Sequence, residues 1–163
     1  MLEQANAGSH IWAISLMLDC EWNESPYEER FLALNLDAVG KGVEVQRLFV
    51  VEKDKVPQFL TNKGVRAHID NKVDNLKAFV IVKERLKESD PDLLTEIGDG
   101  FIAFDDRVAL VDKSSGSGIR GYVTMNAVEI AQLKKIFEQL KIHGWRLDEE
   151  AIKHLEPASE ARS

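Results

Sequence analysis

Two apolar runs that flank one helical stretch decide the fold: HIWAISLML at residues 10–18 and VEVQRLFVV at residues 43–51. The first run is almost continuously apolar, which is typical of a strand covered on both faces. The second is rich in β-branched residues and begins with alternation, which also predicts a strand. Between them, Ser25 and Pro26 predict a helix start, and the helix is expected to end near Gly40–Gly42. Strand, helix, strand predicts a right-handed crossover between parallel strands.

The middle of the chain carries weaker signals. Residues Val56–Asn75 have apolar side chains at near-helical spacing, and Gly64 predicts a break between two helices. The run AFVIV, Ala78–Val82, either extends the second helix or forms a third strand, and its β-branched residues favour the strand. Pro91 then predicts a short helix that continues through Ile97.

The last third predicts a hairpin, a strand and two helices. The runs FIAF and RVALV are separated by Asp105 and Asp106, which indicates a β-hairpin. A flexible connector, SSGSG, precedes a strand at Ile119–Met125. Asn126 then begins a helix that is expected to end at His143-Gly144, and a short helix follows at about Asp148–Leu155.

These elements predict one α/β domain with a mixed, largely parallel sheet flanked by helices and a C-terminal helix. We expect the domain to span residues 10–156, after a disordered lead-in at residues 1–9 and before a tail at residues 157–163.

Composition narrows the function classes. A formal net charge of −7 repels phosphate backbones, so nucleic acid is not an expected partner. Cys20 is the single cysteine, and no charged-then-apolar leader precedes Ile11, which predicts a reducing, cytoplasmic location. No apolar run approaches the roughly 20 residues that span a bilayer, so we expect no membrane partner.

No compact metal or phosphate motif is present in the sequence. His10, His68, His143 and His154 each lack a second ligand three or four residues away, and we interpret them as solvated or capping residues. Gly98-Asp99-Gly100 and Gly116-Ser117-Gly118 do not join a strand to a helix as phosphate loops do. We therefore predict no metal and no cofactor.

The carboxyl ends of the first two strands are the predicted ligand site, because open α/β sheets usually bind ligands there. Asp19, Cys20 and Trp22 follow the first strand, and Glu52 follows the second. Trp22 has a ring suited to stacking on a sugar, a base or a cation. Nearby carboxylates disfavour a thiolate at Cys20, which favours a passive thiol over a nucleophile.

Two sequence segments resemble the phospholipase-D-like family: RFLALNLDAVGKGVEVQRLFVV, Arg30–Val51, and FIAFDDRVALVD, Phe101–Asp112. In that family a helix ending in a Gly-Val turn leads into a strand, and a later hairpin carries a catalytic His-x-Lys followed by an acid. When Asp106 is aligned with that acid, Asp99 and Phe101 replace the histidine and lysine. Aligning Asp105 instead places Gly98 and Gly100 there.

Without the histidine nucleophile, the resemblance implies no phospholipase-D-type catalysis. The chain is then similar to catalytically silent members of the family, which serve as effector-sensing domains in regulators. The resemblance therefore implies a non-catalytic sensory or regulatory domain that binds a small molecule or a protein partner. Because units of this family commonly work in pairs, it also implies a homodimer.

Two other functions stay open from sequence. One is a metal-dependent hydrolase or phosphodiesterase that holds a divalent cation with Asp105, Asp106 and Asp112. The other is a protein-interaction module that presents the apolar stripe of the helix between Val128 and Leu140 and has no ligand pocket.

Overall fold

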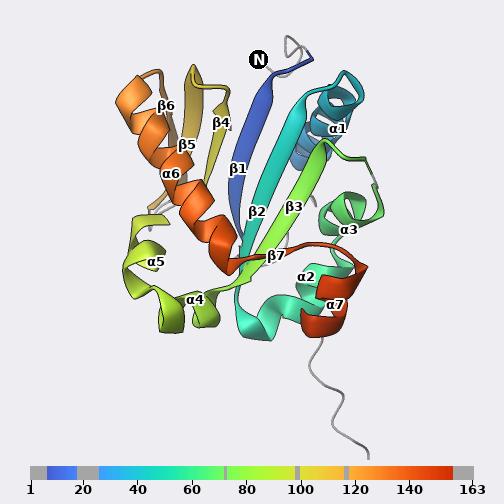
Figure 1. Cartoon of the computed structure of the whole chain (residues 1–163). Coiled ribbons are helices and arrows are strands. Elements are labelled where there is room, and N and C mark those ends of the chain that lie inside the picture. The colour runs from blue at the N-terminus through green and yellow to red at the C-terminus, as the bar shows by residue number, and fades with distance from the viewer. Residues whose placement is uncertain (1–6, 18–25, 72, 98–99, 116–117, 156–163) are drawn as a thin grey trace, which may run out of the picture.

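The computed structural model describes residues 7–17, 26–71, 73–97, 100–115 and 118–155, which form a seven-stranded sheet between two layers of helices (Figure 1). The strands are β1 (His10–Met17), β2 (Glu44–Val51), β3 (Leu76–Val82), β4 (Phe101–Phe104), β5 (Val108–Ser115), β6 (Gly118–Thr124) and β7 (Trp145–Arg146). The helices are α1 (Pro26–Gly40), α2 (Val56–Thr61), α3 (Lys63–Asp70), α4 (Lys83–Ser89), α5 (Pro91–Ile97), α6 (Ala127–His143) and α7 (Glu149–Leu155), with a 3₁₀ turn η2 (Lys53–Lys55) before α2.

The strand order is β6-β5-β4-β1-β2-β3-β7, and only the β1–β2 and β2–β3 pairs are parallel. The other four pairs are antiparallel. The α/β class, the mixed sheet and the C-terminal helix are therefore confirmed, but the prediction of a largely parallel sheet is wrong. After β3 the chain returns to the free edge of β1 and adds β4, β5 and β6, and the consecutive pairs β4–β5 and β5–β6 have connections too short for a parallel crossover.

The predicted crossover is present as β1, α1 and β2. Helix α1 begins at Pro26, and the turn after it has Gly42 at φ 85°, a left-handed conformation that glycine adopts without strain. In β1 and β2, Ile14 lies beside Leu48 in the parallel register. This unit and the parallel β2–β3 pair place the carboxyl ends of β1, β2 and β3 along one edge of the sheet.

Each face of the sheet has its own apolar core. On one face, Phe101 on β4 packs with side chains of α4, α5 and α6, of which Phe137 is fully buried. On the other face, Phe49 on β2 packs with α2, α3 and α7, and α1 covers Val45 with Ala38. Among the described residues, no helix combines the length and apolar character needed to cross a membrane.

Several details differ from the sequence prediction. Ser114 and Ser115 belong to β5 and Gly118 to β6, where a flexible connector was predicted. The break between α2 and α3 lies at Asn62 and not at Gly64, because the Asn62 side chain accepts hydrogen bonds from the backbone N–H groups of Gly64 and Val65 and caps α3. Helix α4 was not predicted, since Leu86 is its one buried residue. Strand β7 was not predicted either, because it has two residues and no pattern of its own.

The N-terminal cap of α6 provides a test of local stability. The Asn126 side chain accepts hydrogen bonds from the N–H groups of Val128 at 2.9 Å and Glu129 at 3.3 Å. We expect Asn126→Ala to lower the free energy of unfolding by about 1 kcal/mol, measured by urea denaturation. The exposed Gln139 in the same helix is the control, and Gln139→Ala should change stability by less than about 0.5 kcal/mol. Equal effects of the two substitutions would contradict a capping role.

Candidate functional site

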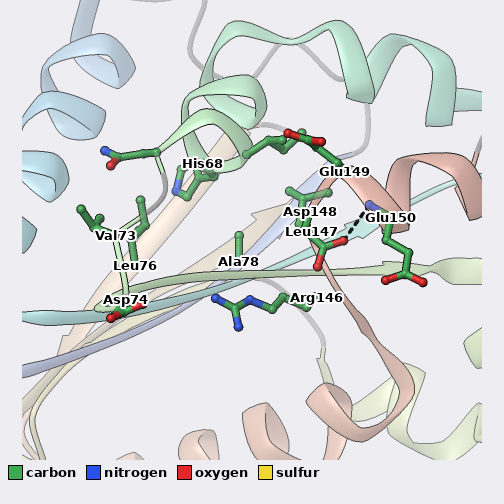
Figure 2. A pocket seen from close by; sticks show the side chains of 12 residues that line it. His68, Val73, Asp74, Leu76, Ala78, Arg146, Leu147, Asp148, Glu149 and Glu150 are labelled. Atoms are coloured by element: carbon green, nitrogen blue, oxygen red, sulfur yellow. Dashed lines mark hydrogen bonds between the residues drawn. The ribbon is translucent and has the colours of Figure 1, made fainter.

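A cavity of about 350 Å³ opens at the edge of the sheet where β3, β7, α3 and α7 meet (Figure 2). It lies beside the amino-terminal half of β3, at the other end of that strand from the predicted ligand site. The lining residues are His68, Ile69, Asn71, Val73, Asp74, Leu76, Ala78, Arg146, Leu147, Asp148, Glu149 and Glu150.

Backbone and cap interactions fix the walls of this cavity. The N–H of Leu147 donates to the carbonyl of Ala78 at 2.8 Å, which holds the β7–α7 connection against β3. Asp148 then accepts hydrogen bonds from the N–H groups of Glu150 and Ala151, at 3.0 and 2.9 Å, and begins α7. Between the lining residues Asp74 and Leu76, the Asn75 side-chain amide donates to the carbonyls of Val39 and Val43. The cavity is therefore bounded by anchored segments.

His68 forms part of the inner wall and is buried, with 5% of its surface exposed. Its Nδ1 lies 2.7 Å from the carbonyl oxygen of Gly64, which can only accept, so Nδ1 carries the proton. Burial, together with the charge of Arg47, lowers the pKa of His68 to about 3, so the ring is neutral at physiological pH. Our interpretation of this histidine as solvated or capping is wrong, because His68 faces inward on α3.

The cavity combines an apolar floor with a negatively charged rim. Leu76, Ala78 and Leu147 are buried and form the floor. Four carboxylate residues stand around it against one arginine, Arg146, so the rim carries a net negative charge. Figure 2 shows the Arg146 side chain extending along β3 in the direction of Asp74. Such a rim favours a positively charged ligand with an apolar portion.

A second hollow, of about 470 Å³, adjoins the first and shares Arg146, Asp148 and Glu150 with it. The guanidinium of Arg85 lies 4.3 Å from the centre of the Trp145 ring, which is a cation–π contact. The two hollows lie around β7 and the start of α7. A ligand longer than one hollow thus has room along this edge.

Of the predicted site residues, Glu52 is described and Asp19, Cys20 and Trp22 lie outside the described residues. Glu52 follows β2, as expected, and its carboxylate accepts a hydrogen bond from Lys83 at 2.8 Å. This lysine lowers the pKa of Glu52, which keeps the carboxylate ionised. The structure therefore places Glu52 at the predicted edge of the sheet but engages its carboxylate in an ion pair.

Arg47 is a buried charged group inside the sheet that the sequence analysis did not predict. It lies in the middle of β2, is 2% exposed, and donates to the Ser15 hydroxyl at 2.8 Å. Burial lowers the pKa of its guanidinium to about 10, so Arg47 stays charged at neutral pH. The available signal was an arginine inside a run otherwise typical of a buried strand. The four acidic residues of the cavity rim did not stand out in the sequence, since surface helices and loops commonly carry acids.

The three carboxylates of the metal-site hypothesis do not come together. Asp105 is in the β4–β5 turn at φ 49°, where its side chain accepts a hydrogen bond from the His10 N–H at 2.7 Å. Asp106 forms an ion pair with Lys134. Asp112 lies in the middle of β5, four residues and about 13 Å beyond the start of that strand at the usual strand rise. Within the described ranges, no group of three or more His, Cys, Asp or Glu residues is placed to hold a metal ion.

Both positions that the resemblance aligns with the family's lysine are described. Phe101 is 2% exposed and belongs to the core beneath α6. A Cβ atom on Gly100 would lie 2.7 Å from the carbonyl oxygen of Ile14, closer than a side chain tolerates. Neither position accommodates an accessible lysine. The corresponding histidine positions, Gly98 and Asp99, lie outside the described residues.

The apolar stripe of α6 packs against the sheet. Ile130, Phe137 and Leu140 are buried in the core, so the stripe is not the exposed patch that the interaction-module hypothesis required. Val128 and Ile142 are the helix's large hydrophobic residues that remain exposed.

No family model, no curated protein and no solved structure matches the chain.

Proposed function

We propose that this chain is a non-catalytic regulatory domain that binds a small organic molecule in the cavity between β3, α3 and α7. The observation that carries the proposal is the combination of a buried apolar floor with four rim carboxylates and a single arginine. This chemistry suits an organic amine with an apolar portion, which the carboxylates attract and the floor accepts. The proposal keeps the cytoplasmic location that the single cysteine suggests.

The phospholipase-D-like resemblance is part of this proposal. Its expected order of elements, a helix with a Gly-Val turn, a strand and a later hairpin, is matched by α1, β2 and β4–β5. The absence of room for a lysine at Gly100 or Phe101 supports a non-catalytic role within that resemblance. The proposed domain acts as a homodimer and transmits ligand binding to a protein partner.

A thermal-shift screen of organic amines against matched carboxylic acids tests the ligand class. An amine at one hundred times its dissociation constant should stabilise the folded chain by about 2.7 kcal/mol, and the matched acid should not. Replacing two rim carboxylates, Asp74→Asn with Glu149→Gln, should weaken amine binding about fivefold, at roughly 0.5 kcal/mol for each exposed charge.

The matched control removes two exposed acids of α5, Asp92→Asn with Glu96→Gln, which lie outside the cavity. This variant has the same net charge as the pocket variant and should bind the amine like the original chain. Equal losses in both variants would indicate a general charge effect and would contradict the pocket. Stabilisation by carboxylic acids and not by amines would overturn the proposed ligand class.

A further inference from the structure

Strand β6 is the outermost strand at one end of the sheet and pairs with β5 alone among the described strands (Figure 1). The outer edge of such a strand presents unpaired backbone N–H and C=O groups, which can pair with another strand. The β5–β6 register is regular from Ala109 opposite Thr124 to Ser115 opposite Gly118, so no bulge turns this edge away. The β6 sequence GIRGYVT has no proline, and Arg120 is its one charged residue. The usual protections of an edge strand are thus nearly absent.

Exposed apolar side chains lie at the end of this edge, with Tyr122 on the face of β6 that meets Glu129 of α6 and Val123 on the opposite face. Val123 is 56% exposed, Met125 78% and Val128 69%, and Tyr122 is partly exposed beside them. These are four of the six large hydrophobic residues exposed among the described residues, and they fall within seven consecutive positions. An apolar group of this kind at an open strand edge indicates a contact surface.

The charge pattern favours a second copy of this chain as the occupant. Residues 121–128, GYVTMNAV, contain no charged residue, although 30% of the chain is charged. In a two-fold contact, residues near the axis meet their own copies, so a charge there would face the same charge. Glu129, the next acid, accepts hydrogen bonds from the hydroxyls of Tyr122 at 2.5 Å and Thr124 at 2.6 Å. Two chains of net charge −7 can therefore approach each other here without direct repulsion.

We infer that two copies associate through β6, antiparallel about a two-fold axis near Val123. The sheet then continues from one copy into the other, and Met125 and Val128 of each copy pack across the junction. This inference gives the surface of the homodimer included in the proposed function and rests on that part of it. It does not depend on the cavity, which lies at the opposite end of the sheet.

Sedimentation equilibrium of the full chain tests this surface, because it measures the mass of the associated species. The original chain should be a dimer at micromolar concentration. Val123→Lys and Val123→Glu should each be monomeric, with dissociation constants raised at least about tenfold. Mixing these two variants should restore a dimer, because unlike charges then meet at the axis. Ile142→Lys is the matched control, since Ile142 is 82% exposed on α6 outside this patch, and it should remain dimeric.

Thermal melts of each variant verify that it is folded. A monomeric original chain would overturn the inference, as would a dimer that survives Val123→Lys or is lost in Ile142→Lys. Failure of the mixed variants to associate would overturn the two-fold arrangement. The amine screen measures binding in the cavity independently of dimer formation. A monomer that binds an amine would therefore refute the dimer surface but not the ligand proposal.

Discussion

Replacing Phe101 with lysine is expected to lower the free energy of unfolding by about 4 kcal/mol or more, measured by urea denaturation followed by circular dichroism. Phe101 is 2% exposed and packs in the core that contains Phe137 and Ile130. The substitution removes the aromatic contacts and introduces an ammonium group that has no water around it. Because a domain of this size is stable by about 5–15 kcal/mol, this single change should unfold a large fraction of the chain on mild heating.

Phe104 on the same strand is the matched control. Its ring is half-buried on the other face, so its lysine side chain can reach water, and Phe104→Lys should cost about 1–2 kcal/mol. Phe101→Met keeps an apolar side chain at the buried position and should cost about 1–2 kcal/mol as well.

The result bears on function as well as on stability. Position 101 is one of the two positions that the resemblance aligns with a catalytic lysine. If Phe101→Lys were as stable as the original chain, an accessible lysine would fit there, and the non-catalytic proposal would lose this support. A large loss of stability would mean that the core, and not chance, excludes the family's catalytic arrangement at this position.

The sequence predicted the elements whose signal is local. The apolar run before Met17, the cap at Asn126 and the paired runs around Asp105 each contain the information that forms the element. The structure has a strand, a helix start and a hairpin turn at these three places. Long apolar runs and side-chain caps determine local structure because their energies depend on near neighbours in the sequence.

The sheet topology was only partly predictable, since it depends on contacts between distant segments. The sequence of the β4–β5 hairpin does not predict that β4 pairs with β1, where Ile14 lies opposite Phe101. Strand β7 exists because Trp145 pairs with Val80 and Arg146 with Phe79, more than sixty residues earlier in the chain. Two residues have no periodicity of their own, so a partner strand must be known before such a strand can be identified.

The candidate cavity was missed for the same reason. Its lining comes from two segments far apart in the chain, between His68 and Ala78 and between Arg146 and Glu150, and nothing in the sequence predicted that they meet. Acids such as Asp74 and Glu150 are ordinary on a surface, and only their convergence at one sheet edge makes them a rim. His68 was the one available hint, because it lies three residues after the buried Val65 and hence on the inner face of α3.

As pH falls below 6.5, His68 should lower the stability of the chain before the aspartate and glutamate side chains begin to bind protons. In the folded chain the pKa of His68 is about 3, against 6.5 for a free histidine, because burial and the charge of Arg47 disfavour the imidazolium. Above pH 6.5 both the folded and the unfolded states hold a neutral ring. Below it, the unfolded chain binds a proton that the folded chain does not, so unfolding becomes easier as pH falls.

The slope rises toward about 1.4 kcal/mol for each pH unit below pH 6.5, so the free energy of unfolding should fall by about 1.6 kcal/mol between pH 6.5 and pH 5. The loss should continue until the pH approaches the folded-state pKa of about 3. Glu44 and Glu52, whose pKa values are lowered in the folded chain, add their own losses only as pH falls below the ordinary glutamate pKa of 4.5. The interval between pH 6.5 and pH 5 therefore reports mainly on histidine.

Urea denaturation at several pH values measures this slope. His68→Asn places a side-chain amide where Nδ1–H donates to Gly64 and removes the titrating ring, so its stability should be nearly constant between pH 6.5 and pH 5. His10→Asn is the control: His10 is much more exposed, and this variant should keep the slope of the original chain. A slope that persists in His68→Asn would mean that another group titrates, and that His68 is not the buried neutral histidine of the cavity wall.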